Sequence, residues 1–211
     1  MKYIVKENEP DEFTRWKAKK NDNWEPTYSN LGGDTKKAVK KALMTEQGYL
    51  CCYCERRLTD GDSHIEHLQP QSTTGSDSVD YGNLLCSCMN QLRKGEPRHC
   101  GHKRGNWFDT ALLVSPLNRD CETRFAYSWN GSIRPASPGD QGAVETIERL
   151  GLGIAKLNRM REKALEPFIE EGLTEEEVSK LVTDHLVRNP QTGYFGEFWT
   201  MISWLFLETN S

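Results

Sequence analysis

Six of the seven cysteines and four of the five histidines of this 211-residue chain lie in one stretch, residues 50–107. A segment so rich in thiols, imidazoles and turn residues has little apolar core of its own, so it needs another source of stability. The first residues are charged and no run of about 18 apolar residues occurs, so we expect a cytoplasmic protein without a membrane span. In the cytoplasm, clustered cysteines more often bind a metal ion than form disulfides.

The spacing of the cysteines predicts one structural Zn²⁺ site. Cys51 and Cys54 form a C-x-x-C pair, in which two thiolates reach one ion from a tight turn. A second pair must come from Cys86, Cys88 and Cys100. We expect Cys88 and Cys100 to be the ligands, with Cys86 as the alternative to Cys88. The remaining cysteines are then ordinary buried thiols.

A carboxylate and an imidazole stand side by side at Glu66 and His67. Polar and apolar residues alternate from His64 onward, which predicts a short strand that ends near Pro70. A carboxylate can hold a cation and an imidazole can take a proton from water, so the pair suits hydrolysis. By itself, however, such a pair on a strand is more often part of an ordinary surface.

The order of the whole stretch favours the hydrolytic interpretation. The C-x-x-C pair is followed by Glu66-His67-x-x-Pro70, then by Asn83-Leu84, and then by Cys100-Gly101-His102-Lys103-Arg104. This order resembles the HNH nucleases, the ββα-metal endonucleases, over residues 50–107.

The resemblance implies a role for each matching residue. His67 would be the general base, Glu66 would bind Mg²⁺ or Mn²⁺ where the family usually has Asp, and Asn83 would orient the loop that holds His67. His102 would be the third motif residue and a second ligand of the catalytic cation. Since Gly101 stands directly after the cysteine, where the family has that residue, His99 is the alternative to His102.

Basic residues are unevenly placed, although the formal net charge of −4 does not by itself indicate a nucleic-acid partner. The segment between Cys88 and Cys100 is expected to form a basic loop beside the site. The residues that we expect to contact nucleic acid are Arg93, Lys94, Lys103 and Arg104. A second group of basic residues lies on the predicted helix 34–47 and comprises Lys36, Lys37, Lys40 and Lys41. These lysines could bind a phosphate backbone, or they could simply form a solvated helix face.

The flanking sequence is similar to the HNH nucleases of retron and Septu antiphage systems, called PtuB, over most of the chain. The matching runs include CCYCERRL, IEHLQPQS and DYGNLLCSC. The resemblance implies a role in antiviral defence, with nucleic acid (DNA first) as the substrate and an ABC-type ATPase as the partner.

We therefore expect an α+β fold with a small zinc-stabilised ββα-metal core in a mostly helical domain. Its parts would be an N-terminal helical segment (1–49), the HNH core with the following hairpin (50–135), and a C-terminal helical region (136–211) that can dock a partner. The predicted helices are 11–20, 34–47, 143–169 with a break at 151–153, 174–187 and 195–207. The predicted strands are 1–5, 64–69 and 111–116, with a hairpin over 124–134.

Two other functions share part of this pattern. A zinc-binding adaptor for nucleic acid or protein would use the same cysteines and basic loop, but it would not need Glu66 and His67. A redox protein using Cys51 and Cys54 is disfavoured, because no βαβ pattern surrounds them.

Overall fold

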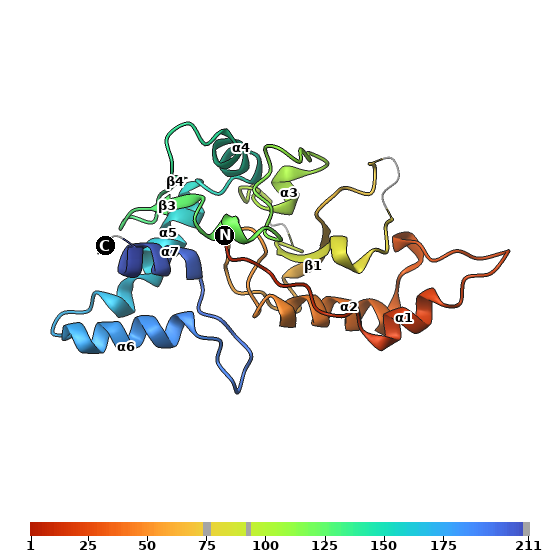
Figure 1. Ribbon diagram of the computed structural model, residues 1–211, viewed down its shortest axis with the longest axis horizontal. Helices are drawn as coiled ribbons and strands as arrows, with labels where there is room; N and C mark the ends of the chain where they lie inside the picture. The colour runs from red at the N-terminus through yellow and green to blue at the C-terminus, as the bar shows by residue number, and fades with distance from the viewer. Residues whose placement is uncertain (74–76, 92–93, 209–211) are drawn as a thin grey trace.

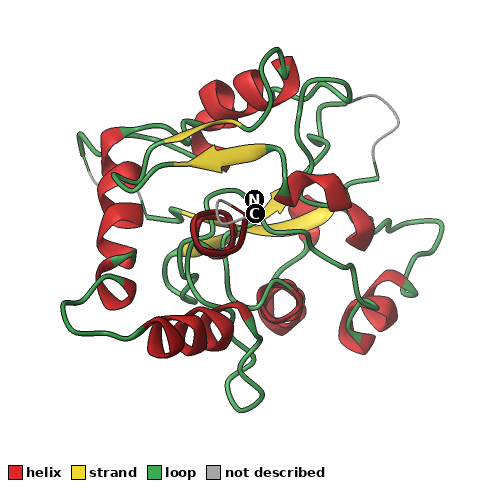
Figure 2. Cartoon of the chain, turned by 60° about the vertical axis from the view of Figure 1, so that its left-hand side comes forward, coloured by secondary structure: helices red, strands yellow, loops and turns green. Residues whose placement is uncertain are grey.

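The computed structural model describes residues 1–73, 77–91 and 94–208, and its fold is α+β, as expected. Two separate two-stranded sheets lie among helices (Figure 2). The helices are α1 Asp11–Lys17, α2 Gly33–Glu46, α3 Gly101–Arg104, α4 Gln141–Leu150, α5 Ala155–Ala164, α6 Glu175–Leu186 and α7 Trp199–Ser203, which continues as a π-helical turn, Trp204–Glu208. The strands are β1 Ser63–His67, β2 Leu84–Cys88, β3 Phe125–Tyr127 and β4 Ile133–Pro135.

The first sheet is formed by the antiparallel strands β1 and β2. Ile65 pairs with Cys86, and His67 pairs with Leu84. Helix α2 packs against both strands through a face that includes the fully buried Val39 and Leu43, as the apolar spacing predicted. Helix α2 thus covers one face of this sheet. In Figure 1, α1, α2 and β1 lie on one side of the molecule, and α5, α6 and α7 lie on the other.

One hydrophobic cluster runs through all three segments that we distinguished in the sequence. It includes Phe13 from the first, Leu84 and Phe125 from the second, and Leu157 and Met201 from the third. The three segments therefore share one packed core. Among the described residues, no helix has both the length and the apolar character that crossing a bilayer requires.

Several predicted elements are confirmed where a local signal specifies them. The long C-terminal helix is broken at Gly151, which adopts φ 63° and ends α4. Thr174 and Glu177 form the predicted capping box at the start of α6. The hairpin of β3 and β4 is present as well, with Gly131 at φ 74° in its turn.

Two predicted strands are wrong. Residues 1–5 are not a strand, because only Ile4 bonds to a neighbouring backbone, donating to Pro116 O at 2.8 Å. Residues 111–116 are not a strand either, because Asp109 accepts the amide of Ala111 at 2.8 Å and bends the chain into turns.

Two predicted helix starts are also wrong. The last helix begins at Trp199 instead of residue 195, since Phe198 before it adopts φ 54°, which a helix cannot include. Helix α2 begins at Gly33, one residue before the predicted start, with Gly32 as its N-cap, and the Asp34 carboxylate pairs with Lys37 at 3.0 Å.

Candidate metal centre and active site

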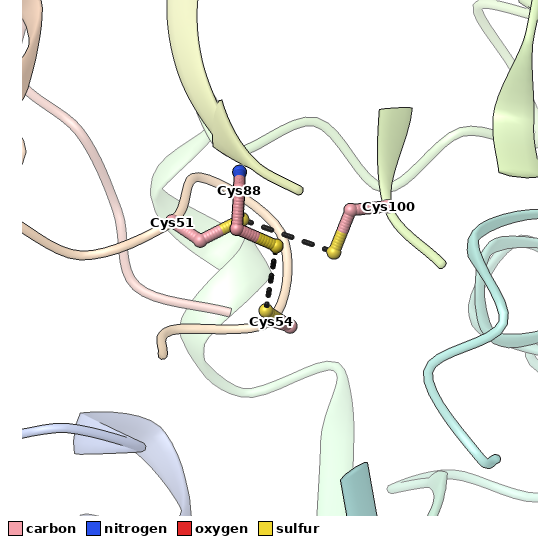
Figure 3. Close-up of side chains that lie close together, drawn as sticks. All are labelled: Cys51, Cys54, Cys88 and Cys100. Atoms are coloured by element: carbon pink, nitrogen blue, oxygen red, sulfur yellow. Dashed lines mark hydrogen bonds between the residues drawn. The ribbon is translucent and has the colours of Figure 1, made fainter. Parts of the chain in front are cut away.

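Four cysteine side chains meet in the interior at the junction of β2 and α3. Cys51 and Cys54 come from the turn before β1, Cys88 ends β2, and Cys100 directly precedes α3. Their sulfurs point toward one another (Figure 3), and all lie within 4.8 Å of each other. The structure thus brings together the four cysteines that the spacing predicted, in a cluster that can hold a metal ion.

The dimensions of this four-cysteine cluster suit Zn²⁺. Cys51 Sγ lies 3.8 Å from Cys100 Sγ, and Cys54 Sγ lies 3.7 Å from Cys88 Sγ. Four sulfurs placed tetrahedrally at ~2.3 Å from one zinc ion stand about 3.8 Å apart. A disulfide would need about 2.05 Å, and all seven cysteines are free. The backbone N–H of Cys88 also donates to Cys51 Sγ at 3.4 Å, which favours a thiolate there.

Cys86, the alternative ligand, lies outside this cluster. It is fully buried in β2, and burial raises the pKa of its thiol to about 12. His99 lies at the cluster instead: it is fully buried, with Nδ1 3.1 Å from Cys100 Sγ. His99 is therefore a neighbour of the sulfurs, with Nδ1 also 3.8 Å from Cys88 Sγ.

Glu66 is buried at 8% exposure and has a defined set of partners. Its Oε1 accepts from Arg104 Nη2 at 2.6 Å and from the Tyr53 hydroxyl at 3.1 Å. Its Oε2 faces His64 Nε2 at 3.4 Å. Burial alone would raise the pKa of Glu66, but the His64 contact and the charge of Arg104 outweigh it and lower the pKa, so the carboxylate is ionised.

The His64 side chain contacts both this carboxylate and the ring of His102. The rings of His64 and His102 are in edge contact, with centroids 5.0 Å apart. A side chain at position 101 would collide with Glu66 Oε2, so Gly101 lets α3 approach the carboxylate closely. His64 Nδ1 is a buried nitrogen without a hydrogen-bond partner among the described residues. His64, to which the sequence analysis gave no role, therefore contacts both the Glu66 carboxylate and the His102 ring.

His67 is held in a definite orientation at the end of β1. Its Nε2 lies 2.9 Å from the backbone oxygen of Ser78, which can only accept, so Nε2 carries the proton and Nδ1 carries the lone pair. Burial is the main cause that lowers the pKa of His67, so the imidazole is neutral and can accept a proton at Nδ1. Nδ1 accepts a long hydrogen bond from the Gln71 side-chain amide, at 3.5 Å.

Asn83 fixes the backbone that follows His67. Its Oδ1 accepts from Gln69 N at 2.7 Å, and its Nδ2 donates to Gln69 O at 2.9 Å. Its own carbonyl accepts from Leu68 N at 3.0 Å. These three bonds hold the segment after β1, which directly follows His67.

The basic residues do not all lie where we expected them. Arg104 is buried at 6% exposure, and its guanidinium donates to Glu66 and to the backbone oxygens of His67 and Leu68, each at 2.6 Å. Its guanidinium is thus bonded to acceptors of the protein itself, and Arg104 also lines the pocket beside His67. Lys103 and Lys94 are exposed, and Arg93 lies outside the described residues.

A pocket opens beside these groups. Its volume is ≈ 460 Å³, and its lining includes Tyr28, Glu66, His67, Gln71 and Asn106. His67 is accessible from solvent through this pocket. The buried four-cysteine cluster does not line this pocket, so the sulfur site and the imidazole–carboxylate site are separate.

Two curated proteins resemble the chain in sequence. The "Retron Vc95 putative HNH endonuclease" of Vibrio cholerae serotype O1 biovar El Tor is 30% identical in an alignment of 141 positions that covers 64% of this chain and 66% of that protein. The "Retron Ec83 putative HNH endonuclease" of Escherichia coli is 26% identical in an alignment of 207 positions that covers 80% of each chain. No protein-family model matches the chain. The matched region thus spans just under two thirds of the first relative and more of the second. These similarities to two proteins named as retron HNH endonucleases agree with the order of the motif residues and support assignment of the chain to the HNH endonucleases of the retron type.

Proposed function

We propose that this protein is a metal-dependent HNH endonuclease that hydrolyses phosphodiester bonds of nucleic acid, with DNA as the first substrate to test. The observation that carries the proposal is the setting of His67. The backbone carbonyl of Ser78 accepts a hydrogen bond from His67 Nε2–H at 2.9 Å, and the ring lines an open pocket beside an ionised, buried carboxylate. Such a base can remove a proton from water at Nδ1.

The residues around His67 then have distinct tasks. Glu66 and His102 would hold Mg²⁺ or Mn²⁺. Glu66 Oε1 accepts from Arg104 and Tyr53, whereas Oε2 faces only His64 in the contacts described above. When bound, the ion supplies positive charge to the phosphate and the leaving oxygen. Asn83 keeps the segment after β1 in place, so that His67 keeps its position relative to the carboxylate.

The four-cysteine cluster has a structural task in this proposal. A bound Zn²⁺ would join the turn before β1, the end of β2 and the start of α3, which carry or adjoin the residues of the active site. All four ligand positions are filled by cysteine, which leaves none open for water, as in structural zinc sites.

The relatives also support a biological setting. Both are named as retron proteins, so we propose that this nuclease acts in an antiphage defence system. The ABC-type ATPase partner and the Septu or PtuB type rest on the flanking resemblance alone. Co-expression with a neighbouring ATPase gene and copurification on size-exclusion chromatography test the partner directly.

The second candidate function is a zinc-binding adaptor without cleavage, which would share the four-cysteine cluster and the exposed Lys94 and Lys103. A plasmid-nicking assay with Mg²⁺ or Mn²⁺ separates the two. We expect wild type to nick the plasmid and His67→Ala to lose this activity by at least about a hundredfold, the usual contribution of general-base catalysis. Both proteins must have equal zinc content and melting temperature. Cleavage that survives in His67→Ala contradicts the mechanism, and inactivity of wild type with its partner present favours the adaptor.

A further inference from the structure

One lysine on α2 differs from its neighbours on the same face. Lys37 and Lys40 each pair with an aspartate, at 3.0 and 2.7 Å respectively. Lys36 has no carboxylate partner among the residues that the structure describes. Its Nζ lies instead over the ring of Tyr28, 4.7 Å from the centroid. A half-buried cation on an aromatic ring keeps its charge available to an incoming anion.

Tyr28 joins this lysine to the candidate base. The Tyr28 ring is in edge contact with the His67 ring, with centroids 4.6 Å apart. The backbone N–H of Tyr28 also donates to Ser78 Oγ at 3.1 Å, and Ser78 is the residue whose carbonyl holds His67.

Two pockets meet at Tyr28. The active-site pocket of ≈ 460 Å³ shares Tyr28 and Ile65 with a second pocket of ≈ 280 Å³, which Lys36, Lys37 and Lys40 line. The path from His67 across Tyr28 therefore ends among lysines. A polyanionic chain that places one phosphate at His67 would place a neighbouring phosphate near these ammonium groups.

We propose that Lys36, held in place by Tyr28, binds a backbone phosphate of the substrate strand next to the phosphate that is cleaved, and that the strand continues into the lysine-lined pocket on α2. This inference rests on the proposed nuclease function and extends it, because it gives the substrate a direction across the protein. It also adds to the active site two residues, Lys36 and Tyr28, that lie outside the HNH motif.

Lys41 offers a matched control on the same helix. It is exposed and lines neither pocket. It follows Lys36 by five residues, which places it about 140° further round the helix axis. Lys41→Ala removes the same charge from α2 as Lys36→Ala, and Lys36→Arg retains the charge at the proposed position.

The test is the salt dependence of binding, measured by fluorescence anisotropy. All variants carry His67→Ala so that no cleavage occurs, and the probes are a labelled duplex DNA and its single strand. We expect Lys36→Ala to reduce the slope of log K against log salt by about 0.9 on duplex, or about 0.7 on the single strand, for one lost phosphate contact. Lys36→Arg should keep the slope of the parent protein, which carries His67→Ala alone. Lys41→Ala should change that slope by less than half as much as Lys36→Ala does.

Equal slopes for Lys36→Ala and Lys41→Ala overturn the inference, as does the absence of measurable binding to either probe. These outcomes are distinct from failure of the proposed function, because binding is measured without turnover. If wild type fails to nick plasmid while Lys36→Ala still lowers the slope selectively, the binding path stands and the nuclease activity fails. In an active enzyme, Lys36→Ala should also lower kcat, since a contact beside the scissile phosphate positions it for attack.

Discussion

Replacing Cys100 by serine should release the metal ion that we assign to the four-cysteine cluster. Cys100 is fully buried, and its sulfur lies 3.8 Å from that of Cys51. Structural zinc in small domains contributes about 10–16 kcal/mol of apparent binding free energy at pH 7. For a chain of this length each 1 kcal/mol changes the melting temperature by about 2–4 °C. Loss of only ~5 kcal/mol of the metal's contribution therefore lowers the melting temperature by roughly 10–20 °C.

The assay combines elemental analysis with a thermal melt of the purified protein. Wild type should contain zinc in a ratio near one per chain, and Cys100→Ser should contain none. Cys86→Ser is the matched control, because Cys86 is equally buried but lies outside the cluster. It should keep its zinc and lose only about 1–3 kcal/mol for the buried hydroxyl. If Cys86→Ser loses zinc as completely as Cys100→Ser, or if Cys100→Ser keeps it, the ligand assignment is refuted.

Three further outcomes follow from the contacts described above. Asn83→Ala removes two hydrogen bonds to the backbone after β1 and should lower plasmid nicking with a stability loss of about 1–3 kcal/mol, measured by urea unfolding. Arg104→Met leaves Glu66 buried without its countercharge and should lower the free energy of unfolding by about 3–5 kcal/mol in the same assay. The exposed neighbour gives the contrast, because Lys103→Ala should weaken DNA binding and leave the free energy of unfolding unchanged. Burial lowers the pKa of His185, so the unfolded chain binds a proton that the folded chain does not, and stability should fall as the pH drops below the ordinary histidine value of about 6.5. Melting temperatures at pH 7.5 and 5.5 check this last outcome, and His185→Gln should reduce the difference.

The elements that could be predicted from the sequence are those with a signal inside the element itself. The capping box at Thr174 and the left-handed glycine at residue 151 act within a few residues, so each specified a helix boundary. The wrong strands, residues 1–5 and 111–116, have β-favouring residues but no partner edge. A strand depends on a neighbour elsewhere in the chain, which a local pattern does not show.

The same distinction applies to the candidate site. The four cysteines were predictable as a group because zinc accepts few spacings and geometries. The burial of Arg104 was not, because it depends on Glu66, a carboxylate at 8% exposure that needs a countercharge. Tyr28 was missed as a site residue, and Lys36 was named only within a group of four lysines, because both precede the motif. Packing of α2 against β1 brings Lys36 near it, and contacts with His67 and Ser78 place Tyr28.

The position of α3 connects the two sites. This helix has only four residues, far too few to be stable alone. It is fixed at its start by Cys100, whose sulfur belongs to the four-cysteine cluster and whose N–H donates to Leu150 O at 2.7 Å. Helix α3 then places His102 against His64, and it places the Arg104 guanidinium on the Glu66 carboxylate. The four-cysteine cluster therefore does more than stabilise the fold. It also positions α3, whose Arg104 bonds to the Glu66 carboxylate and whose His102 contacts His64.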